Sequence, residues 1–312
     1  MKCQTIHSLT GSCFYVRIQK MNAQNVGDTL NISEEKWTTV IRPQRPWWDL
    51  GLGELWRYRG LIALWVRREF VALYKQTIFG PLWHVIPTVI SSGVFTVIFS
   101  NFAKISTDGT PPFLFYMAGN TLWVYFSGCV SATSTTFSSN AGIYGKVYFP
   151  RLAMPIASII SNLISVGVRF GVFLVFWTYF LLSGSTLHPN LWILLLPVLL
   201  LIVAGMGLGA GILVSALTTK YRDFQQLLGV GLQLAMYGSP IIYPVSNVPE
   251  HLRWIILLNP LTPVFEAFRL GFLGVSSVDP IYVLYSIGFM MALLFASIII
   301  FNRAEKTFLD TI

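Results

Sequence analysis

The sequence predicts an all-α membrane protein with six transmembrane helices, an N-terminal amphipathic interface helix, and re-entrant half-helices between spans five and six. Of its 312 residues, 54% are hydrophobic and 11% are charged, whereas an average soluble domain has about 25% charged residues. Six runs lack Lys, Arg, Asp and Glu, and a helix that crosses hydrocarbon needs about 20 apolar residues. These runs are 76–103, 109–145, 152–168, 170–219, 224–249 and 280–302.

Residues 1–46 are expected to form a polar cytoplasmic extension. They mix Ser, Thr, Asn, Gln and charged residues and end in Arg42-Pro43-Gln44-Arg45-Pro46, a composition typical of weakly ordered chain. Their first 40 residues contain no continuous apolar run of the kind that a signal peptide requires. Insertion is therefore expected to be directed by the first span.

Residues 47–79 contain a predicted amphipathic interface helix, drawn over 49–76. On a helical wheel its apolar side carries Leu55, Tyr58, Ile62, Trp65, Val66 and Leu73, and the opposite side carries Arg57, Arg67, Arg68 and Lys75. The basic face suits lipid phosphates or a partner protein. The separation is imperfect, because Trp56, Leu64 and Val71 lie on the basic side and Glu69 on the apolar side. Burial against the bundle or a second protein would account for that mixture.

Residues 80–305 are expected to form the membrane domain, followed by a cytoplasmic tail at 306–312. The six spans are drawn at 81–103, 112–136, 153–182, 190–217, 227–245 and 280–302. The fourth has the strongest signal because Leu191–Leu217 is uncharged and rich in leucine, and the fifth has the weakest because Pro240 and Pro244 interrupt it. Between the last two spans, 248–274 contains apolar pieces too short to cross, broken by Pro260 and Pro263, and is assigned as re-entrant.

Basic residues divide unequally between the two sides of these spans. One side has 17 and the other has 3, with Arg169 inside a span. The positive-inside rule places both termini in the cytoplasm, and an even number of spans agrees with it. The excess of 21 basic over 13 acidic residues therefore reflects membrane topology, and no nucleic-acid partner is expected.

Catalytic signatures are missing from the sequence. It has no H-E-x-x-H, C-x-x-C or G-x-S-x-G, and the nearest approach to a phosphate-binding loop, Asn140–Val147, lacks the required first Gly and last Ser or Thr. The three cysteines have no metal-ligand spacing. We expect no enzyme activity, no catalytic or metal-ligating residue and no cofactor in this chain, so that any ATP and Mg²⁺ would be held by another polypeptide.

Residues 139–152 form a short cytoplasmic link between the second and third spans. The link is either a plain basic loop or a docking segment in which an apolar knob has a basic rim, a combination that suits an interface hot spot. Its candidate contact residues are Tyr144, Lys146, Tyr148, Phe149, Pro150 and Arg151.

Charged and small residues inside the membrane domain give further predictions. Arg169 is expected to face the bundle or water, bound to carbonyl groups or to a pyrophosphate. Glu266 and Arg269, spaced i, i+3 in the re-entrant segment, are expected to pair. Glycines at 205, 207, 209 and 211 form two overlapping small-xxx-small patterns that favour close helix packing.

Aromatic residues make up 15% of the chain. Several near span ends belong either to an interfacial belt or to a pore in which flat rings stack on sugars. The candidate channel aromatics are Trp83, Phe115, Tyr116, Trp123, Tyr125, Phe126, Tyr237 and Tyr243.

Short motifs at consistent positions carry a resemblance. They are Tyr74-Lys75-Gln76-Thr77-Ile78-Phe79-Gly80-Pro81-Leu82-Trp83, Phe149-Pro150-Arg151-Leu152, Tyr221-Arg222-Asp223, Ser239-Pro240-Ile241-Ile242-Tyr243-Pro244, and Asn259-Pro260-Leu261 with Glu266-Ala267-Phe268-Arg269. From about residue 50 to 305 the chain resembles the permease subunit of ABC-2 type polysaccharide exporters, which export O-antigen, capsular polysaccharide or teichoic acid.

The resemblance implies a homodimer of permeases in the bacterial inner membrane, working with two ATPase subunits that hold ATP and Mg²⁺. It implies that the helix at 49–76 lies at the membrane surface, that 139–152 is the coupling segment received by the ATPase, and that 248–274 is the re-entrant pair on the outer side. The substrate would be a lipid-linked polysaccharide, as in lipopolysaccharide biosynthesis.

The resulting prediction is an ABC-2 permease for export of an O-antigen-like polysaccharide. Its alternatives are an ABC-2 exporter of small hydrophobic compounds, a membrane glycosyltransferase or polymerase, and an ion channel. A glycosyltransferase would group acidic residues at a membrane face, but here they are scattered, at Asp108, Asp223, Glu250, Glu266 and Asp279. An ion channel would need an acidic ring or a carbonyl filter sequence.

Overall fold

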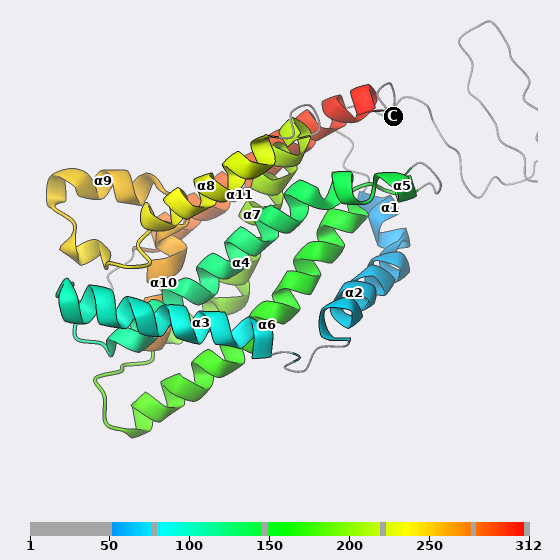
Figure 1. Ribbon diagram of the computed structural model, residues 1–312. Helices are drawn as coiled ribbons and strands as arrows, with labels where there is room; N and C mark the ends of the chain where they lie inside the picture. The colour runs from blue at the N-terminus through cyan, green and yellow to red at the C-terminus, as the bar shows by residue number, and fades with distance from the viewer. Residues whose placement is uncertain are drawn as a thin grey trace, which may run out of the picture. The chain divides into compact units, whose positions relative to one another are not determined.

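The computed structural model describes residues 52–75, 80, 82–144, 149–218, 223–275 and 279–308. These residues belong to one compact unit, Leu50–Ile312, and every regular element in the described part is a helix (Figure 1). The expected extension at 1–46, Lys146, Tyr148 and the end of the tail at 309–312 lie outside the described residues.

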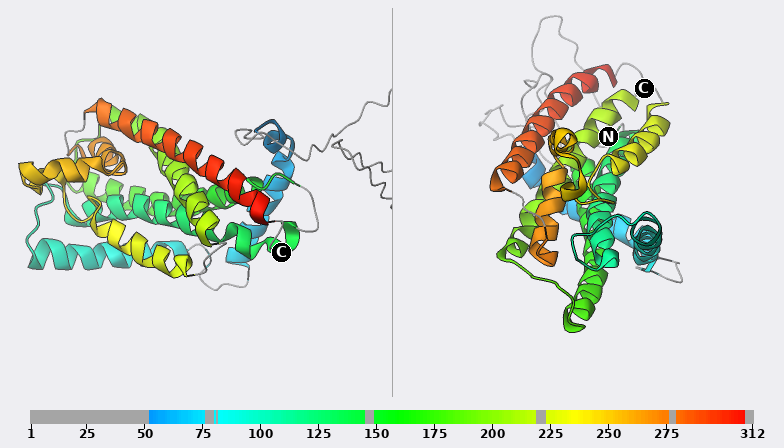
Figure 2. Two further views of the ribbon diagram at one scale, coloured as in Figure 1. Left: turned by 90° about the horizontal axis from the view of Figure 1, so that it is seen from above. Right: turned by 90° about the vertical axis from the view of Figure 1, so that its left-hand side faces the viewer.

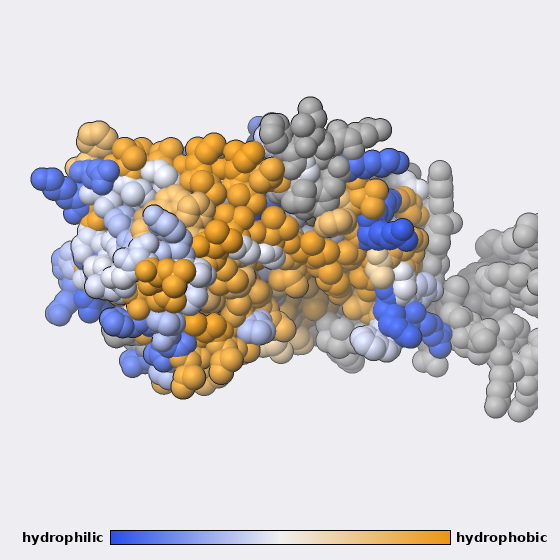
Figure 3. Space-filling view, turned by 90° about the horizontal axis from the view of Figure 1, so that it is seen from below, coloured by the Kyte–Doolittle hydropathy of each residue, from blue (hydrophilic) through white to orange (hydrophobic). Residues whose placement is uncertain are grey.

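Four segments are long and apolar enough to cross a membrane. They are Leu82–Phe102, made of α3 (Leu82–Phe95) and a π-helical turn, η1 (Thr96–Phe102); α6 (Ala153–Leu182); Leu191–Thr218, made of η2 (Leu191–Leu195) and α7 (Leu196–Thr218); and the Pro280–Phe301 part of α11 (Pro280–Phe308). They coincide with the expected first, third, fourth and sixth spans. A broad apolar band separates two polar ends on the face shown in Figure 3, as expected of a multi-pass membrane protein.

The expected second span is α4 (Pro112–Ser139), which is not among these four although its 28 residues extend about 42 Å. Helix α4 is less apolar than the four candidate spans, which suits its position among α3, α6 and α7 (Figure 1). Residues 114–123 are all buried. Polar side chains there bond inside the protein, since Thr121 Oγ1 donates to the Met117 carbonyl at 2.8 Å and Asn120 Nδ2 donates to Ser91 Oγ at 2.6 Å. Over residues 114–123, helix α4 is therefore surrounded by protein and not by lipid.

The expected fifth span, 227–245, contains only a short helix, α8 (Phe224–Tyr237). Its 14 residues extend about 21 Å, less than the roughly 30 Å of a hydrocarbon core. The helix ends at Tyr237, with Gly238 as its C-cap two residues before Pro240, and the chain continues irregularly to the 3₁₀ turn η3 (Val245–Asn247). By length and composition the described residues contain four spans, or five if the bent pair described next counts as one.

The expected re-entrant segment is a bent pair of helices, α9 (Glu250–Leu258) and α10 (Thr262–Leu273), at 100° to each other. Helix α9 has no buried residue, whereas eleven of the twelve residues of α10 are buried. Helix α11 holds the bend, because Tyr285 Oη donates to the Leu258 carbonyl at 2.8 Å and Ser286 Oγ to the Pro260 carbonyl at 2.7 Å. Thus α9 lies on the surface at one end of the bundle and α10 enters its interior (Figures 1 and 2).

The glycines of α7 face two different helices. A Cβ atom at Gly207 or Gly211 would lie 2.5 Å from the Cβ of Cys129 or Thr133 on α4. At Gly205 or Gly209 it would meet Met290 or Leu293 on α11. Each small-xxx-small pattern therefore lets one neighbouring helix approach α7 closely, in agreement with the packing interpretation of the sequence.

Candidate functional site

The expected interface helix is two helices, α1 (Leu52–Arg57) and α2 (Arg59–Tyr74), joined at Tyr58. Ile62 and Trp65 of α2 are buried in a cluster with Phe149 of the link and with Met154 and two alanines at the start of α6. The wheel's apolar side thus faces α6, with Leu55, Tyr58 and Val66 packed around the cluster.

The four residues that did not fit the two-sided helical wheel are explained by a hydrogen bond or by exposure. Glu69, on the apolar side, accepts a hydrogen bond from Ser158 Oγ of α6 at 3.0 Å. Trp56, Leu64 and Val71, on the basic side, are exposed by 72%, 60% and 44%. The apolar side packs within the chain, and the opposite side presents large apolar residues to whatever surrounds the chain.

Phe149 differs from the sequence-based expectation of an exposed knob. Its side chain is only 5% exposed, and its ring meets the Trp65 ring edge-on with centroids 4.8 Å apart. The reason is that Trp65 of α2 packs against Phe149 and covers the aromatic ring that would otherwise face water. Pro150 and Arg151 are partly buried beside it. Tyr144 is the last residue of the short α5 (Ala141–Tyr144), and Lys146 and Tyr148 lie outside the described residues.

Arg169, inside the third expected span, is partly buried and bonds to α3. Its Nε donates to the His84 carbonyl at 3.1 Å, and one terminal nitrogen lies 3.2 Å from His84 Nδ1. The guanidinium is thus bound to a backbone carbonyl at the start of α3, which is one of the two alternatives left open by the sequence. These bonds tie α6 to α3.

Glu266 and Arg269 pair inside the bundle. Arg269 donates to Glu266 Oε1 at 3.3 Å and to the Ile241 carbonyl at 2.9 Å, and its guanidinium carbon lies 3.7 Å from the centroid of the Phe115 ring. Arg269 is 1% exposed and Glu266 is 5% exposed. A buried charge is tolerated only when it is paired and hydrogen-bonded, so this pair joins α10, the loop after α8, and α4 at one point. The sequence indicated the pair but not its contacts to Ile241 and Phe115.

The candidate channel aromatics lie in two kinds of environment. Phe115, Tyr116, Trp123 and Tyr125 of α4 are buried in the main hydrophobic core, and Phe126 and Tyr243 are partly buried. Trp83 and Tyr237 are exposed by 55% and 53%. Only the last two residues of this set have more than half of their surface exposed.

A polar chamber near α9 was not anticipated from the sequence. It lies among the 104–110 loop, η3, the α9–α10 bend and the start of α11, and Arg253, Glu266, Asp108 and Asp279 line it. The available signal was topological, since these residues all fall on the same side of the predicted spans. Among the residues that the structure describes, no group of three or more His, Cys, Asp or Glu residues is arranged to hold a metal ion.

These helices define a multi-pass membrane protein whose bent helix pair enters the bundle at one end. Residues 61–273 match the family described as ABC-2 type transporter. Since the match covers well over half of the chain, the chain belongs to the ABC-2 type transporter family.

Similar proteins include two O-antigen export system permease proteins named RfbA. The one from Klebsiella pneumoniae is 26% identical over 80% of this chain and 94% of its own length, and the one from Myxococcus xanthus is 26% identical over 83% and 98%. The capsule polysaccharide export inner-membrane protein CtrC of Neisseria meningitidis serogroup A is 21% identical over 72% of this chain and 84% of its own length.

Proposed function

We propose that this chain is the permease subunit of a bacterial inner-membrane ABC transporter that exports a lipid-linked polysaccharide of the O-antigen class. The observation that carries the proposal is the extent of the similarity. Two O-antigen export permeases match over 94% and 98% of their own lengths, which leaves little of either protein without a counterpart here. These relatives favour a polysaccharide over a small hydrophobic compound as the substrate.

A separate ATPase is proposed to supply the energy. The sequence lacks a phosphate-binding loop, and the ABC-2 family to which the chain belongs is a family of transport subunits. We propose a complex of two permeases and two ATPase subunits, in which ATP and Mg²⁺ bind only to the ATPases.

The segment at 139–152 is proposed to receive the motion of the ATPase. Phe149 supports this role in a way that the sequence did not suggest, because its ring joins the link to both α2 and the start of α6. A push on the link would therefore move an interface helix and a transmembrane helix together. Helices α1 and α2 are proposed to lie at the cytoplasmic membrane surface, with Trp56 and Leu64 in lipid.

Six crossings with both termini in the cytoplasm are proposed for the membrane domain. Helix α4 is long enough to cross, and α8 is continued by the buried stretch at 239–242. The unequal division of basic residues, 17 against 3, supports the orientation. It places α9 and α10 on the outer side as a re-entrant pair. Trp83 and Tyr237 are the candidate aromatics that are exposed enough to line a conduit between two copies.

The proposal can be tested in cells by deleting the gene for this chain and measuring polysaccharide at the cell surface. We expect the surface polysaccharide to disappear, lipid-linked polysaccharide to accumulate inside, and the intact chain to restore export only together with an active ATPase. Surface polysaccharide at wild-type levels in the deletion strain would overturn the proposal. Loss of resistance to hydrophobic compounds with unchanged polysaccharide would instead support an exporter of small compounds.

A further inference from the structure

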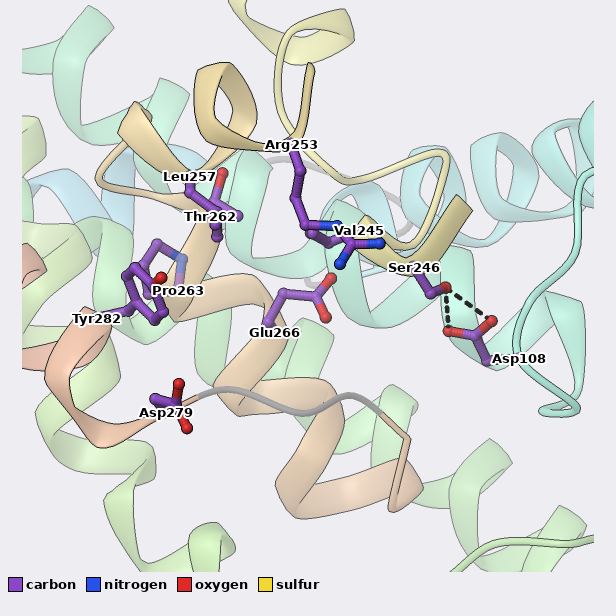
Figure 4. A pocket seen from close by; sticks show the side chains of 10 residues that line it. All are labelled: Asp108, Val245, Ser246, Arg253, Leu257, Thr262, Pro263, Glu266, Asp279 and Tyr282. Carbon is purple, nitrogen blue, oxygen red and sulfur yellow. Dashed lines mark hydrogen bonds between the residues drawn. The ribbon is translucent and has the colours of Figure 1, made fainter. Parts of the chain in front are cut away.

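The chamber near α9 is a hollow of about 560 Å³, which lies in the range of about 300–1,000 Å³ typical of small-molecule sites. Five separate segments contribute to it: the 104–110 loop, η3, α9, α10 and the start of α11 (Figure 4). The bend between α9 and α10 forms one side. Any movement of α9 relative to α10 would therefore reshape the chamber.

Two charged side chains face each other across this chamber. Arg253 of α9 and Glu266 of α10 point toward one another (Figure 4), yet the ion pair of Glu266 is made with Arg269, behind the chamber wall. Glu266 is buried, with only 5% of its surface exposed. The buried Nε of Arg253 has no hydrogen-bond partner within the part of the chain that the structure describes. Buried polar groups are nearly always hydrogen-bonded, so this guanidinium is incompletely bonded, and its terminal nitrogens, which point into the chamber (Figure 4), are the donors that a ligand would meet.

The remaining polar lining provides hydrogen-bonding groups of both kinds. Ser246 Oγ donates to both carboxylate oxygens of Asp108, at 2.8 and 2.9 Å, which fixes that carboxylate at the chamber edge. Asp279 and Tyr282 line the opposite side, at the start of α11. The chamber thus combines three carboxylates, one guanidinium and one aromatic ring.

We propose that this chamber binds one to a few sugar units of the exported glycan as it leaves the conduit. This inference rests on the proposed function and adds a binding site to it. Sugar hydroxyls both donate and accept hydrogen bonds, so they match carboxylates and a guanidinium in one site. The face of a sugar ring is apolar and stacks on an aromatic ring such as Tyr282. Binding must be weak enough for the glycan to move on, as conduction through a binding pore generally requires.

Other ligand chemistries fit this lining less well. An anion such as pyrophosphate would meet three carboxylates and a single guanidinium, so like charges would oppose its binding. A divalent cation would require several acidic ligands around one point, and within the described residues no group of three or more such ligands converges.

Ligand binding by the complete chain in lipid nanodiscs tests the proposal. The probes are di- to tetrasaccharides released by mild acid from the surface polysaccharide of the same cells, and binding is measured by saturation-transfer NMR and calorimetry. We expect saturable binding that Arg253→Gln weakens about tenfold or more, since a lost hydrogen bond to a charged group has roughly that effect. Asp279→Asn, at an exposed position of the lining, is expected to weaken binding as well.

The matched control is Lys104→Gln, which removes a positive charge from the neighbouring groove outside the chamber. It should bind the oligosaccharides as the wild type does. Equal binding by the wild type and both chamber variants, or no saturable binding by the wild type, would overturn the proposal. If sodium pyrophosphate bound in an Arg253-dependent way and the oligosaccharides did not bind, the ligand of the chamber would be an anion and not a saccharide. Surface polysaccharide is measured in the same strains. If export requires this chain but the chain binds no saccharide, the chamber proposal fails while the proposed export function stands.

Discussion

Gly211→Ala perturbs the contact between α4 and α7, the pair that forms the centre of the bundle. The new Cβ atom would lie 2.5 Å from Thr133 Cβ and 2.9 Å from the Val130 carbonyl oxygen, whereas ordinary contacts begin at 3.4 Å. Neither obstacle is the end of a flexible side chain, because one is a Cβ atom and the other belongs to the backbone. The two helices must therefore separate by about 1 Å at this point.

The expected magnitude follows from two opposing effects. Overpacking a filled interior costs about 1–3 kcal/mol, whereas alanine in place of glycine favours a helix by about 0.8–1 kcal/mol. Gly288→Ala on α11 and Gly171→Ala on α6 are matched controls, because within the described residues no atom beyond the neighbouring backbone of its own helix lies within 4 Å of either new Cβ. They change helix propensity alone. The free energy of unfolding of Gly211→Ala should thus fall about 1–3 kcal/mol below that of the controls.

The assay is reversible unfolding of the purified chain in mixed micelles, with SDS as denaturant and helix content followed by circular dichroism. We expect both controls to match or slightly exceed the wild type and Gly211→Ala to unfold at lower SDS. If Gly211→Ala were as stable as the controls, the close approach of α4 and α7 would be wrong.

Three further predictions concern the site. Phe149→Ala should destabilise the chain by about 3–5 kcal/mol and detach α2 from α6, which limited proteolysis between the two would detect; unchanged protection would show that the ring does not hold them together. Arg269→Met should destabilise by about 3–5 kcal/mol because it leaves Glu266 charged and unpaired, and adding Glu266→Gln should restore part of that loss in the same SDS titration. A cysteine at Asn247 should react with an impermeant reagent outside intact cells and a cysteine at Lys146 should not, since the unequal distribution of basic residues places Asn247 outside and Lys146 in the cytoplasm. Labelling of the cysteine at Lys146 from outside would reject the six-span topology.

Local patterns were sufficient to predict the features that depend on local chemistry. The four candidate spans follow from long apolar runs, and the bent pair follows from Pro260 and Pro263, which break short apolar helices. The double glycine pattern predicted close helix packing, and the structure shows that each set of glycines faces a different helix, because a period of four residues places each set on one face.

Contacts between distant residues were not predictable in this way. Helix α4 is less apolar than a lipid-facing span because protein surrounds it, and the apolar run at 224–249 exceeds the length of α8 because proline ends a helix without adding charge. Phe149 was expected to be exposed because nothing in its neighbourhood of the sequence indicates Trp65, 84 positions earlier. The chamber formed by Arg253 and Glu266 also depends on a fold that brings several loops together.

The most direct measurement of the central claim is translocation in a purified system. The chain and its partner ATPase would be reconstituted in vesicles that carry a fluorescent lipid-linked oligosaccharide, and a membrane-impermeant enzyme inside the vesicles would modify any glycan that arrives there. The account predicts modification only when the chain, the ATPase and external ATP are all present, and none with a hydrolysis-deficient ATPase. Modification that proceeds equally without this chain, or none with all components present and the ATPase active, would contradict it.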